Sequence, residues 1–173
     1  MFPIGVSPAI VFALLLPLLA LVVGAPTKAA DELVSFRIMA PKLALDLAEA
    51  ALADCRKRGF QVAVAVVDRF GVPQAMLRDT LAGPHTPDTA IAKARTAVSF
   101  RATTEQLSAL TQAGQLNSAI RHIPGYIFLG GGVPVEAGGM IVGGIGISGA
   151  PSGTEDDACA RAGIEAVEDR LLM

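Results

Sequence analysis

The chain has 173 residues, with 14 lysines and arginines against 16 aspartates and glutamates, and a formal charge of −2. This length is enough for one domain with a hydrophobic core and little more. The charge balance leaves no basic patch for nucleic acid, and a chain with no Trp and one Tyr offers few rings on which bases or sugars could stack. We therefore expect a small globular protein that does not bind nucleic acid.

The first thirty residues differ from the rest of the chain. Residues 9–23 form an unbroken apolar run that contains Pro17, and small and polar residues follow it. The run is shorter than the roughly 20 residues that a spanning helix needs, and its length and position are typical of a secretory signal peptide. We predict a signal peptide over residues 1–30, cleaved between Ala25 and Ala30, and a periplasmic or secreted domain over residues 31–173 with no stable membrane span. An uncleaved anchor is the alternative.

The residues after position 40 predict a helix followed by a β-hairpin. Apolar residues recur on one helical face from Pro41 to Lys57, and Gly59 suits the helix end. These apolar residues are Ala44, Leu47, Ala48, Ala51, Leu52 and Cys55. Residues 61–68 are β-branched and apolar on both faces, which is typical of a central strand covered by helices. The short link at 69–71 makes residues 72–78 the antiparallel partner strand.

Two helices, three strands and a last helix follow. Thr86, Pro87 and Asp88 have the order of an N-cap, a first-turn proline and an acidic residue, which predicts a helix to about Phe100. Residues 103–106 form a capping box for a helix that ends near Gly114. Short strands are predicted at residues 126–129, 133–136 and 140–147, and a helix from about 154 to 172. The order α-β-β-α-α-β-β-β-α predicts an α+β domain with helices packed against one antiparallel sheet.

The two cysteines, Cys55 and Cys159, allow two interpretations. In the oxidising compartment that export implies, they could form a disulfide. Both also lie on apolar faces of predicted helices, where a cysteine is an ordinary small core residue. The sequence leaves both open, and two cysteines with no histidine nearby do not make a structural zinc site.

Gly144, Gly146 and Gly149 match the G-x-G-x-x-G pattern between a predicted strand and a predicted helix. A dinucleotide site needs a following βαβ unit with an acidic residue about 20 residues on. Only 24 residues remain after Gly149, and the one element predicted among them is a helix. We therefore reject a nucleotide site and predict that these glycines let a helix or a ligand approach the strand closely.

Four charged residues, Asp68, Arg78, Asp79 and Lys93, lie beside the predicted hairpin. They could form an acid/base set. No Ser or Cys is paired with a His at a strand-to-helix elbow, however, as acyl transfer would require. We expect the two aspartates to form surface ion pairs at the strand ends.

His85 and His122 are the two histidines, and both fall in predicted loops. A neutral imidazole is the commonest ligand to haem iron, although either residue could be an ordinary exposed histidine. His85 is the sharper candidate, because Gly83 and Pro84 precede it and a predicted helix begins directly after it. A helix N-terminus there would favour a nearby carboxylate. No C-x-x-C-H sequence occurs, so haem attachment of the c-type is excluded.

Several segments together resemble the GlcG/HbpS haem-binding family, which is also met as the C-terminal domain of some corrinoid adenosyltransferases. The segments are Val64-Ala65-Val66-Val67-Asp68-Arg69-Phe70-Gly71, Lys93-Ala94-Arg95-Thr96-Ala97, Gly130-Gly131-Gly132-Val133-Pro134 and Ile145-Gly146-Ile147-Ser148-Gly149-Ala150. The resemblance spans about residues 41–172 and rests on their order and spacing. It implies a central five-stranded antiparallel sheet, self-association into a homo-oligomer, and binding of haem or a related tetrapyrrole or iron.

The resemblance also guides the choice of site residues. Residues 83–86 are similar to the segment before the Lys-Ala-x-Thr-Ala stretch in exported family members, which favours His85 as the axial iron ligand. We expect Arg78 or Lys93 near the haem propionates, and Gly131 in a glycine-rich loop at the site. The chain is then a haem-binding protein for storage, relay or sensing, with no catalytic residues of its own.

Two other functions remain as alternatives. One is a haem-degrading or other small enzyme of the same fold, although ring cleavage needs electrons from a partner and no flavin or nicotinamide motif is found. The other is a small-acid or signal-binding module that uses the glycine-rich loops and Arg78. Titration with haem separates the binding protein from both.

Overall fold

The computed structural model describes residues 34–115 and 117–172. The predicted signal peptide lies outside these residues. Among the described helices, none is both long and apolar enough to cross a membrane.

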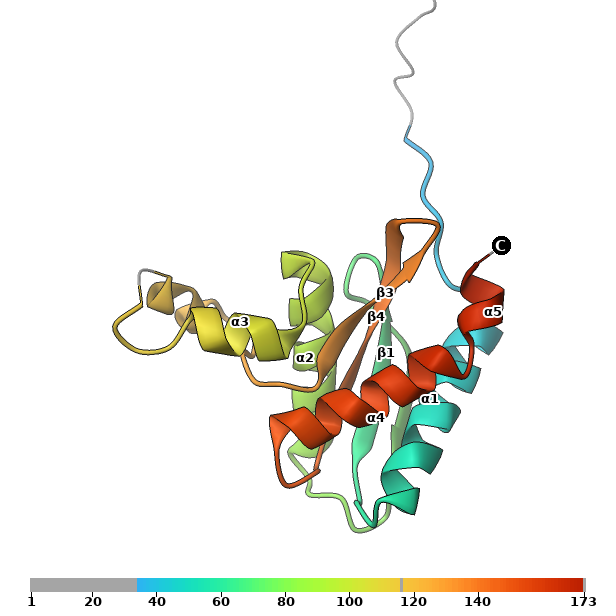
Figure 1. Ribbon diagram of the computed structural model, residues 1–173, viewed down its shortest axis with the longest axis horizontal. Helices are drawn as coiled ribbons and strands as arrows, with labels where there is room; N and C mark the ends of the chain where they lie inside the picture. Colours follow the sequence, from blue (N-terminus) through green and yellow to red (C-terminus); the bar gives the residue numbers. More distant parts are fainter. Residues whose placement is uncertain (1–33, 116, 173) are drawn as a thin grey trace, which may run out of the picture. The chain divides into compact units, whose positions relative to one another are not determined.

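The fold is of the predicted α+β class, built on an antiparallel sheet (Figure 1). The four strands are β1 (Ala63–Asp68), β2 (Pro73–Arg78), β3 (Gly132–Ala137) and β4 (Met140–Ser148), in the order β2-β1-β4-β3. The pairs β1–β2 and β3–β4 are antiparallel hairpins. The first of these hairpins was predicted from the sequence. Strand β4 joins the two hairpins, because it pairs with β1 along the whole length of β1.

Helices α1 (Pro41–Lys57) and α4 (Gly153–Glu165) cover one face of the sheet, and the short α5 (Glu168–Leu171) follows α4 (Figure 1). All six residues predicted to form the apolar face of α1 are buried there: Ala44, Leu47, Ala48, Ala51, Leu52 and Cys55. They pack against aliphatic side chains of the strands, including Val64, Val66 and Ile145. The main hydrophobic core therefore lies between these helices and the sheet.

Helix α2 (Thr86–Phe100) packs against the opposite face, where the strands carry glycine and alanine. A Cβ placed on Gly146 would lie 2.0 Å from the carbonyl oxygen of Ala90, and one on Gly144 would lie 2.7 Å from Val98 Cγ2. No other residue fits at either position without moving the helix. The close helix approach predicted for these glycines is confirmed.

The predicted fifth strand at residues 126–129 is absent from the described sheet. The backbone N–H of Ile127 donates instead to the Thr96 hydroxyl of α2 at 2.9 Å. Phe128 is buried with its ring edge against Phe100, with the ring centroids 5.2 Å apart. The apolar pattern of this segment thus reflects packing on a helix, because its backbone hydrogen bond goes to a side chain and not to a neighbouring strand.

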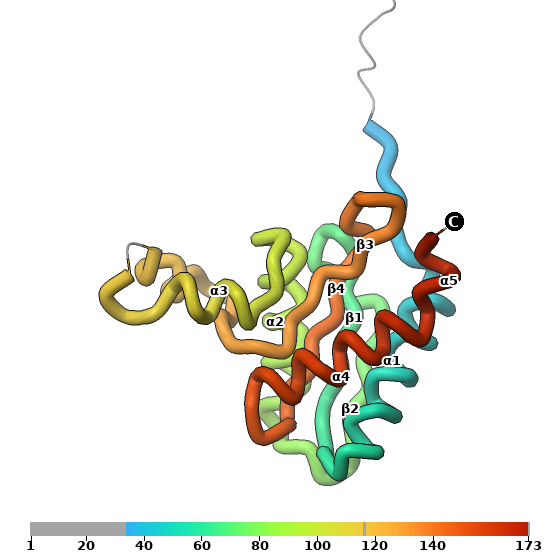
Figure 2. Tube along the Cα trace, viewed as in Figure 1, coloured from blue at the N-terminus to red at the C-terminus, as the bar shows by residue number. Residues whose placement is uncertain are grey.

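Helix boundaries also differ from the predictions at three places. The capping box at Thr103 and Gln106 is present, but α3 (Thr104–Leu110) ends earlier than predicted. A 3₁₀ helix, η1 (Ser118–His122), follows it, and the two project away from the sheet (Figure 2). The N-cap of α2 is His85, with Thr86 as its first residue. Ser152 caps α4, and the predicted single last helix is interrupted between α4 and α5.

The two cysteines form a disulfide between α1 and α4. The Cα atoms of Cys55 and Cys159 are 5.4 Å apart, within the usual range for a bridge. Both residues are fully buried. Of the two interpretations that the sequence left open, the structure has the disulfide, and the bridge lies inside the main core.

Candidate functional site

Two cavities share the start of α2. One, of about 580 Å³, is bounded by the first turns of α2 and by the glycine-rich segment 148–153. The other, of about 650 Å³, lies between α2 and residues 125–127 and reaches Pro73 of β2. His85, Thr89 and Ile127 line both. These volumes are within the range that small-molecule sites in proteins occupy.

His85 is exposed at the N-cap of α2, and its position depends on Gly83. A Cβ on Gly83 would lie 2.8 Å from His85 Cε1 and 3.0 Å from Nδ1. The Nδ1–Cε1 edge of the ring therefore rests over the glycine, and Nε2 is the ring nitrogen farther from it. The Thr86 hydroxyl donates to the Gly83 carbonyl at 2.7 Å and ties the loop to the helix. The imidazole makes no hydrogen bond or ion pair within residues 34–115 and 117–172, so a ring nitrogen is available to a ligand.

Lys93 lies at the base of the first cavity and is only 1% exposed. Its ammonium donates to Asp156 Oδ2 at 2.7 Å and to the Ile147 carbonyl at 2.9 Å. Burial raises the pKa of the Asp156 carboxyl, because the loss of solvation outweighs the attraction of Lys93 and the hydrogen bond from Ala150 N–H. Lys93 is thus neutralised within the fold and does not offer a free positive charge to a propionate.

Gly131 supports this buried pair. Its φ of +110° is rarely adopted by other residues. A Cβ there would lie 2.5 Å from Asp156 Cβ and 3.0 Å from Lys93 Nζ. Gly131 therefore allows the backbone to pass directly over the ion pair, beside the cavity but not among its lining residues.

Arg78 lies apart from both cavities. Its guanidinium donates to the carbonyl of Ala82 at 2.6 Å and to that of Thr80 at 3.4 Å, so it orders the loop that leads to His85. Arg95, which the sequence analysis did not select, lines the second cavity together with His85 and Tyr126. Arg95 Nε donates to the Gly71 carbonyl at 3.3 Å. Lys93 and Arg95 each share a cavity with the histidine, and among the described residues Arg95 is the one of the two that is not held in an ion pair.

The remaining charged candidates have structural positions. Asp68 accepts hydrogen bonds from the N–H groups of Phe70 and Val72 and shapes the β1–β2 turn. Asp79 is buried and accepts from Arg56 Nε at 2.7 Å. The expected ion pair is thus present at Asp79, although the aspartate is buried, and Asp68 forms a turn instead. His122 is exposed in η1 and lines neither cavity beside His85.

Asp156 is the residue that the sequence analysis missed. Lys93 lies three residues after Ala90 and one before Ala94, both on the buried face of α2, so its side chain also enters the interior. A buried ammonium needs a partner charge, and the acidic start of α4 supplied the candidates. Arg95 and Tyr126 could not be selected, because the cavity they share forms only when residues 125–127 fold onto α2.

Comparison with known proteins identifies the family. Residues 39–165 match the model of a family described as "Haem degrading protein HbpS-like". The comparison with curated proteins gives no significant match.

Several solved structures are similar, and three of them illustrate the range of identity. A double mutant of HbpS from Streptomyces reticuli is 43% identical, with a TM-score of 0.73 over 83% of this chain and 97% of that one. A PduOC:heme complex is 29% identical, with a TM-score of 0.70 over 75% of this chain and 94% of that one. The Klebsiella pneumoniae protein ORFY, at 23% identity and a TM-score of 0.77 over 80% of this chain and 97% of that one, shares the fold. The chain, matched over most of its length by the family model, belongs to the HbpS-like family.

Proposed function

We propose that this chain is an exported haem-binding protein in which His85 is an axial ligand to the haem iron. Membership in the HbpS-like family and the similarity to PduOC, whose structure is a heme complex, support haem as the ligand. The observation that carries the site assignment is the position of His85, whose exposed imidazole lines two cavities at once.

The residues around His85 fit a tetrapyrrole. Haem has a flat apolar ring, a central iron and two carboxylates at one edge. Apolar side chains, Ile91, Ile127 and Leu129 among them, line the cavities on either side of the histidine. Bound haem would supply an iron that can be coordinated by a nitrogen of the imidazole. His85 would hold the iron and Gly83 would orient the ring of His85.

Arg95 is the residue that we assign to the propionates. It lines the cavity that also holds His85 and is half-buried. A guanidinium can donate to a carboxylate through two parallel N–H groups. Lys93 and Arg78 keep structural roles in this proposal, because the hydrogen bonds described above already occupy them.

Titration with hemin tests the assignment. The protein without its predicted leader should give a Soret band with defined stoichiometry, and His85→Ala should shift that band and weaken binding. Added imidazole should restore part of the wild-type spectrum, because it replaces the missing donor. His122→Ala is the matched control and should leave the spectrum unchanged. Equal spectra for the wild type and His85→Ala would move the ligand to another residue, and a free-hemin spectrum for the wild type would end the haem proposal.

Two further variants separate the supporting residues. Gly83→Ala should alter the Soret band without removing the imidazole, because its Cβ would displace the ring. Arg95→Gln should weaken haem binding by about tenfold, the value of one lost charge-assisted pair, with the Soret position unchanged. Breakdown of the ring on addition of a reductant and oxygen would favour the degrading activity named in the family description over storage or relay.

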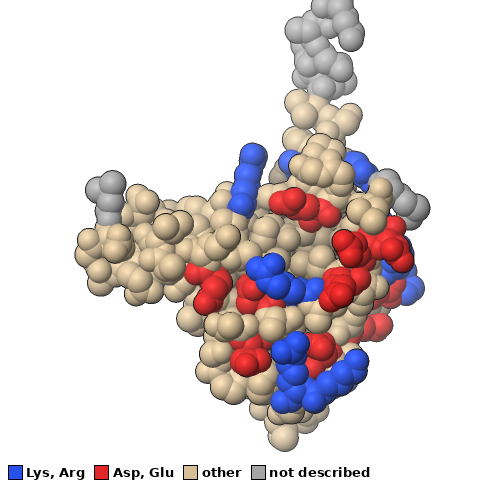
Figure 3. All heavy atoms as spheres, in the orientation of Figure 1, with Lys and Arg blue, Asp and Glu red and all other residues tan. Residues whose placement is uncertain are grey.

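Self-association is part of the proposal. The arm formed by α3 and η1, residues 104–122, exposes Leu110, and Ile123 follows it. The outer part of this arm shows no charged side chain on the face in view in Figure 3. Exposed apolar surface of this kind favours association. Sedimentation should give several protomers, and a monomer at micromolar concentration would contradict this.

N-terminal sequencing of protein from the periplasm or medium tests export and cleavage between Ala25 and Ala30.

A further inference from the structure

A third cavity, of about 530 Å³, lies at the opposite end of α2 from His85. It is formed by the β1–β2 turn, the C-terminal end of α2 and the β3–β4 hairpin. Its lining includes Arg69, Arg101 and Glu136 as charged residues and Val98 and Ile141 as apolar ones. His85 precedes α2 and Arg101 follows it, so about 24 Å of helix axis separates this cavity from His85.

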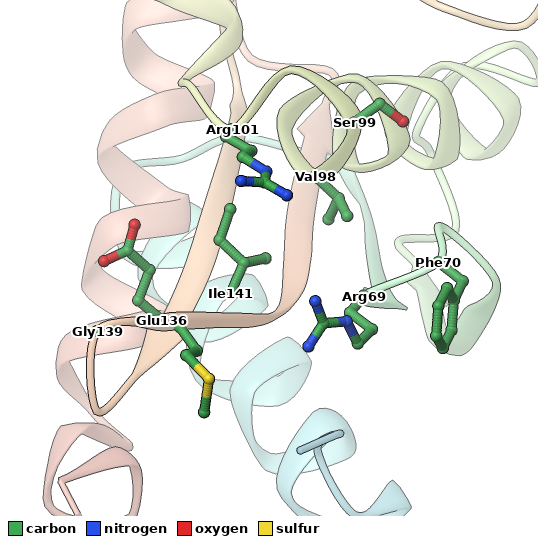
Figure 4. A pocket seen from close by; sticks show the side chains of 9 residues that line it. Arg69, Phe70, Val98, Ser99, Arg101, Glu136, Gly139 and Ile141 are labelled. Atoms are coloured by element: carbon green, nitrogen blue, oxygen red, sulfur yellow. The ribbon is translucent and has the colours of Figure 1, made fainter. Parts of the chain in front are cut away.

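Two guanidinium groups point into this cavity from different elements. Figure 4 shows Arg101 and Arg69 reaching toward the same space, with Ile141 between them and Glu136 on the other side. Neither guanidinium makes an ion pair or a hydrogen bond within the part of the chain that the structure describes. This contrasts with Arg56, Arg58, Arg161 and Arg170, each of which is paired with an acidic residue.

Arg69 is held in place by aromatic rings. Its guanidinium carbon lies 4.0 Å from the centroid of the Phe36 ring and 5.8 Å from that of Phe70. The two rings meet edge to face, with centroids 5.6 Å apart. Contact with the two rings limits the positions that the guanidinium can take. Arg69 is therefore oriented before any ligand arrives.

Arg101 is held by an unusual backbone conformation. It is the one non-glycine residue of the described chain with a positive φ, +53°, and it ends α2 as a left-handed C-cap. Glycine or asparagine usually takes this position. An arginine there costs stability relative to glycine, and it places a guanidinium at the cavity, which neither of those residues could do.

We propose that this cavity binds a small organic anion, whose carboxylate or phosphate group is held between Arg69 and Arg101. Guanidinium groups recognise both kinds of oxyanion through paired N–H donors. Val98 and Ile141 provide an apolar wall for the body of the ligand. Glu136 brings the charge of the cavity to one positive unit, which favours an anion of low charge and offers an acceptor to a hydroxyl or ammonium group of the same ligand.

Calorimetric titration of the leaderless protein with acetate and with inorganic phosphate tests the site. We expect one site per chain for at least one of the two anions, and the tighter one identifies the head group. Arg69→Gln and Arg101→Asn should each weaken binding by about tenfold or more, as the loss of a charge-assisted pair requires. Glu136→Gln should tighten it, because a negative charge leaves the cavity.

The controls separate a built site from general charge and from the haem site. Lys57→Gln removes one positive charge at the end of α1 and should bind as the wild type does. Asn tolerates the left-handed conformation, so Arg101→Asn should remain folded with an unchanged melting temperature or a higher one. His85→Ala should bind the anion normally. The proposal is overturned if neither anion shows saturable binding, if both arginine variants bind like the wild type, or if Lys57→Gln weakens binding equally.

Discussion

The two faces of the sheet are packed by different means. The face under α1 and α4 carries large aliphatic side chains, such as Val66 and Ile147, and the only disulfide of the described chain joins the two helices above it. The face under α2 carries glycine and alanine, so that the helix backbone lies directly on the strands. The three cavities that we assign to ligands all adjoin α2 and lie near its two ends.

This difference separates stability from binding. Aliphatic burial and a covalent bridge fix the α1–α4 layer, which reaches these cavities only at the start of α4, with Gly153 and Asp156. The α2 layer buries less side-chain volume, but it places His85 at one end of the helix and Arg101 at the other. Variants of the two layers should therefore have different effects. Substitutions in the α1–α4 core should lower stability alone, and substitutions in the α2 layer should lower both stability and ligand binding.

The largest effect is expected from the disulfide. Replacing Cys55 and Cys159 together with Ala should lower the free energy of unfolding by about 4 to 5 kcal/mol in the chain-entropy model, because the bridge closes a loop of about 100 residues. Urea denaturation measures the change. Reductant should destabilise the wild type and leave the double variant unaffected. Hemin and anion binding by the folded variant should be retained, and equal stability of variant and wild type would show that the bridge does not form.

The next largest effect is expected from the Lys93–Asp156 pair, which joins α2 to the start of α4. Asp156→Leu leaves a buried ammonium without a partner charge, which should cost about 3 to 5 kcal/mol. Lys93→Met leaves Asp156 unpaired and should be destabilising as well. In the variant that carries both changes, stability should return toward that of the wild type, because no uncompensated charge remains. Additive losses in this double-mutant cycle would contradict a direct pair.

A third comparison uses one added methyl group on each face. Gly146→Ala places a Cβ 2.0 Å from the Ala90 carbonyl and must push α2 away, which should cost about 1 to 3 kcal/mol or more. Gly163→Ala, between α4 and α1, meets Ala51 Cβ at 2.7 Å and gains about 1 kcal/mol of helix propensity, so its net loss should be smaller. Thermal unfolding of the two variants measures the difference. Gly146→Ala should also weaken hemin binding, since it displaces the helix that carries His85.

The sequence predicted the helices α1 and α2 better than the groups that gather at the cavities. The face of α1 follows directly from helical periodicity, because apolar side chains that recur every three or four residues lie on one side of a helix. The Tyr126–Leu129 segment was wrongly predicted as a strand, because short apolar runs do not show whether a strand or a helix will cover them. At the proposed site, His85 was selected from its local loop. Asp156, Arg95, Arg69 and Arg101 are brought to their cavities by tertiary contacts, which a local pattern does not encode.

The smallest effect is expected at the surface of the molecule, at Asp46, which links α1 to α5. It accepts hydrogen bonds from Lys42 and, at 2.8 Å, from Arg170 of α5, and these two cations lower the pKa of Asp46 below its ordinary value of 3.8. A group whose pKa is lower in the folded state stabilises the fold above its unfolded pKa, and that contribution is lost as the pH falls through the folded value. Asp46→Asn should therefore be slightly less stable than the wild type near neutral pH and equally stable in strong acid. Added salt should shrink the difference at neutral pH, because the pair is exposed and screened. Urea unfolding at the two pH values measures it, with Glu49→Gln on the same helix as the control, and a difference that persists unchanged into acid would show that the carboxylate of Asp46 is not its source.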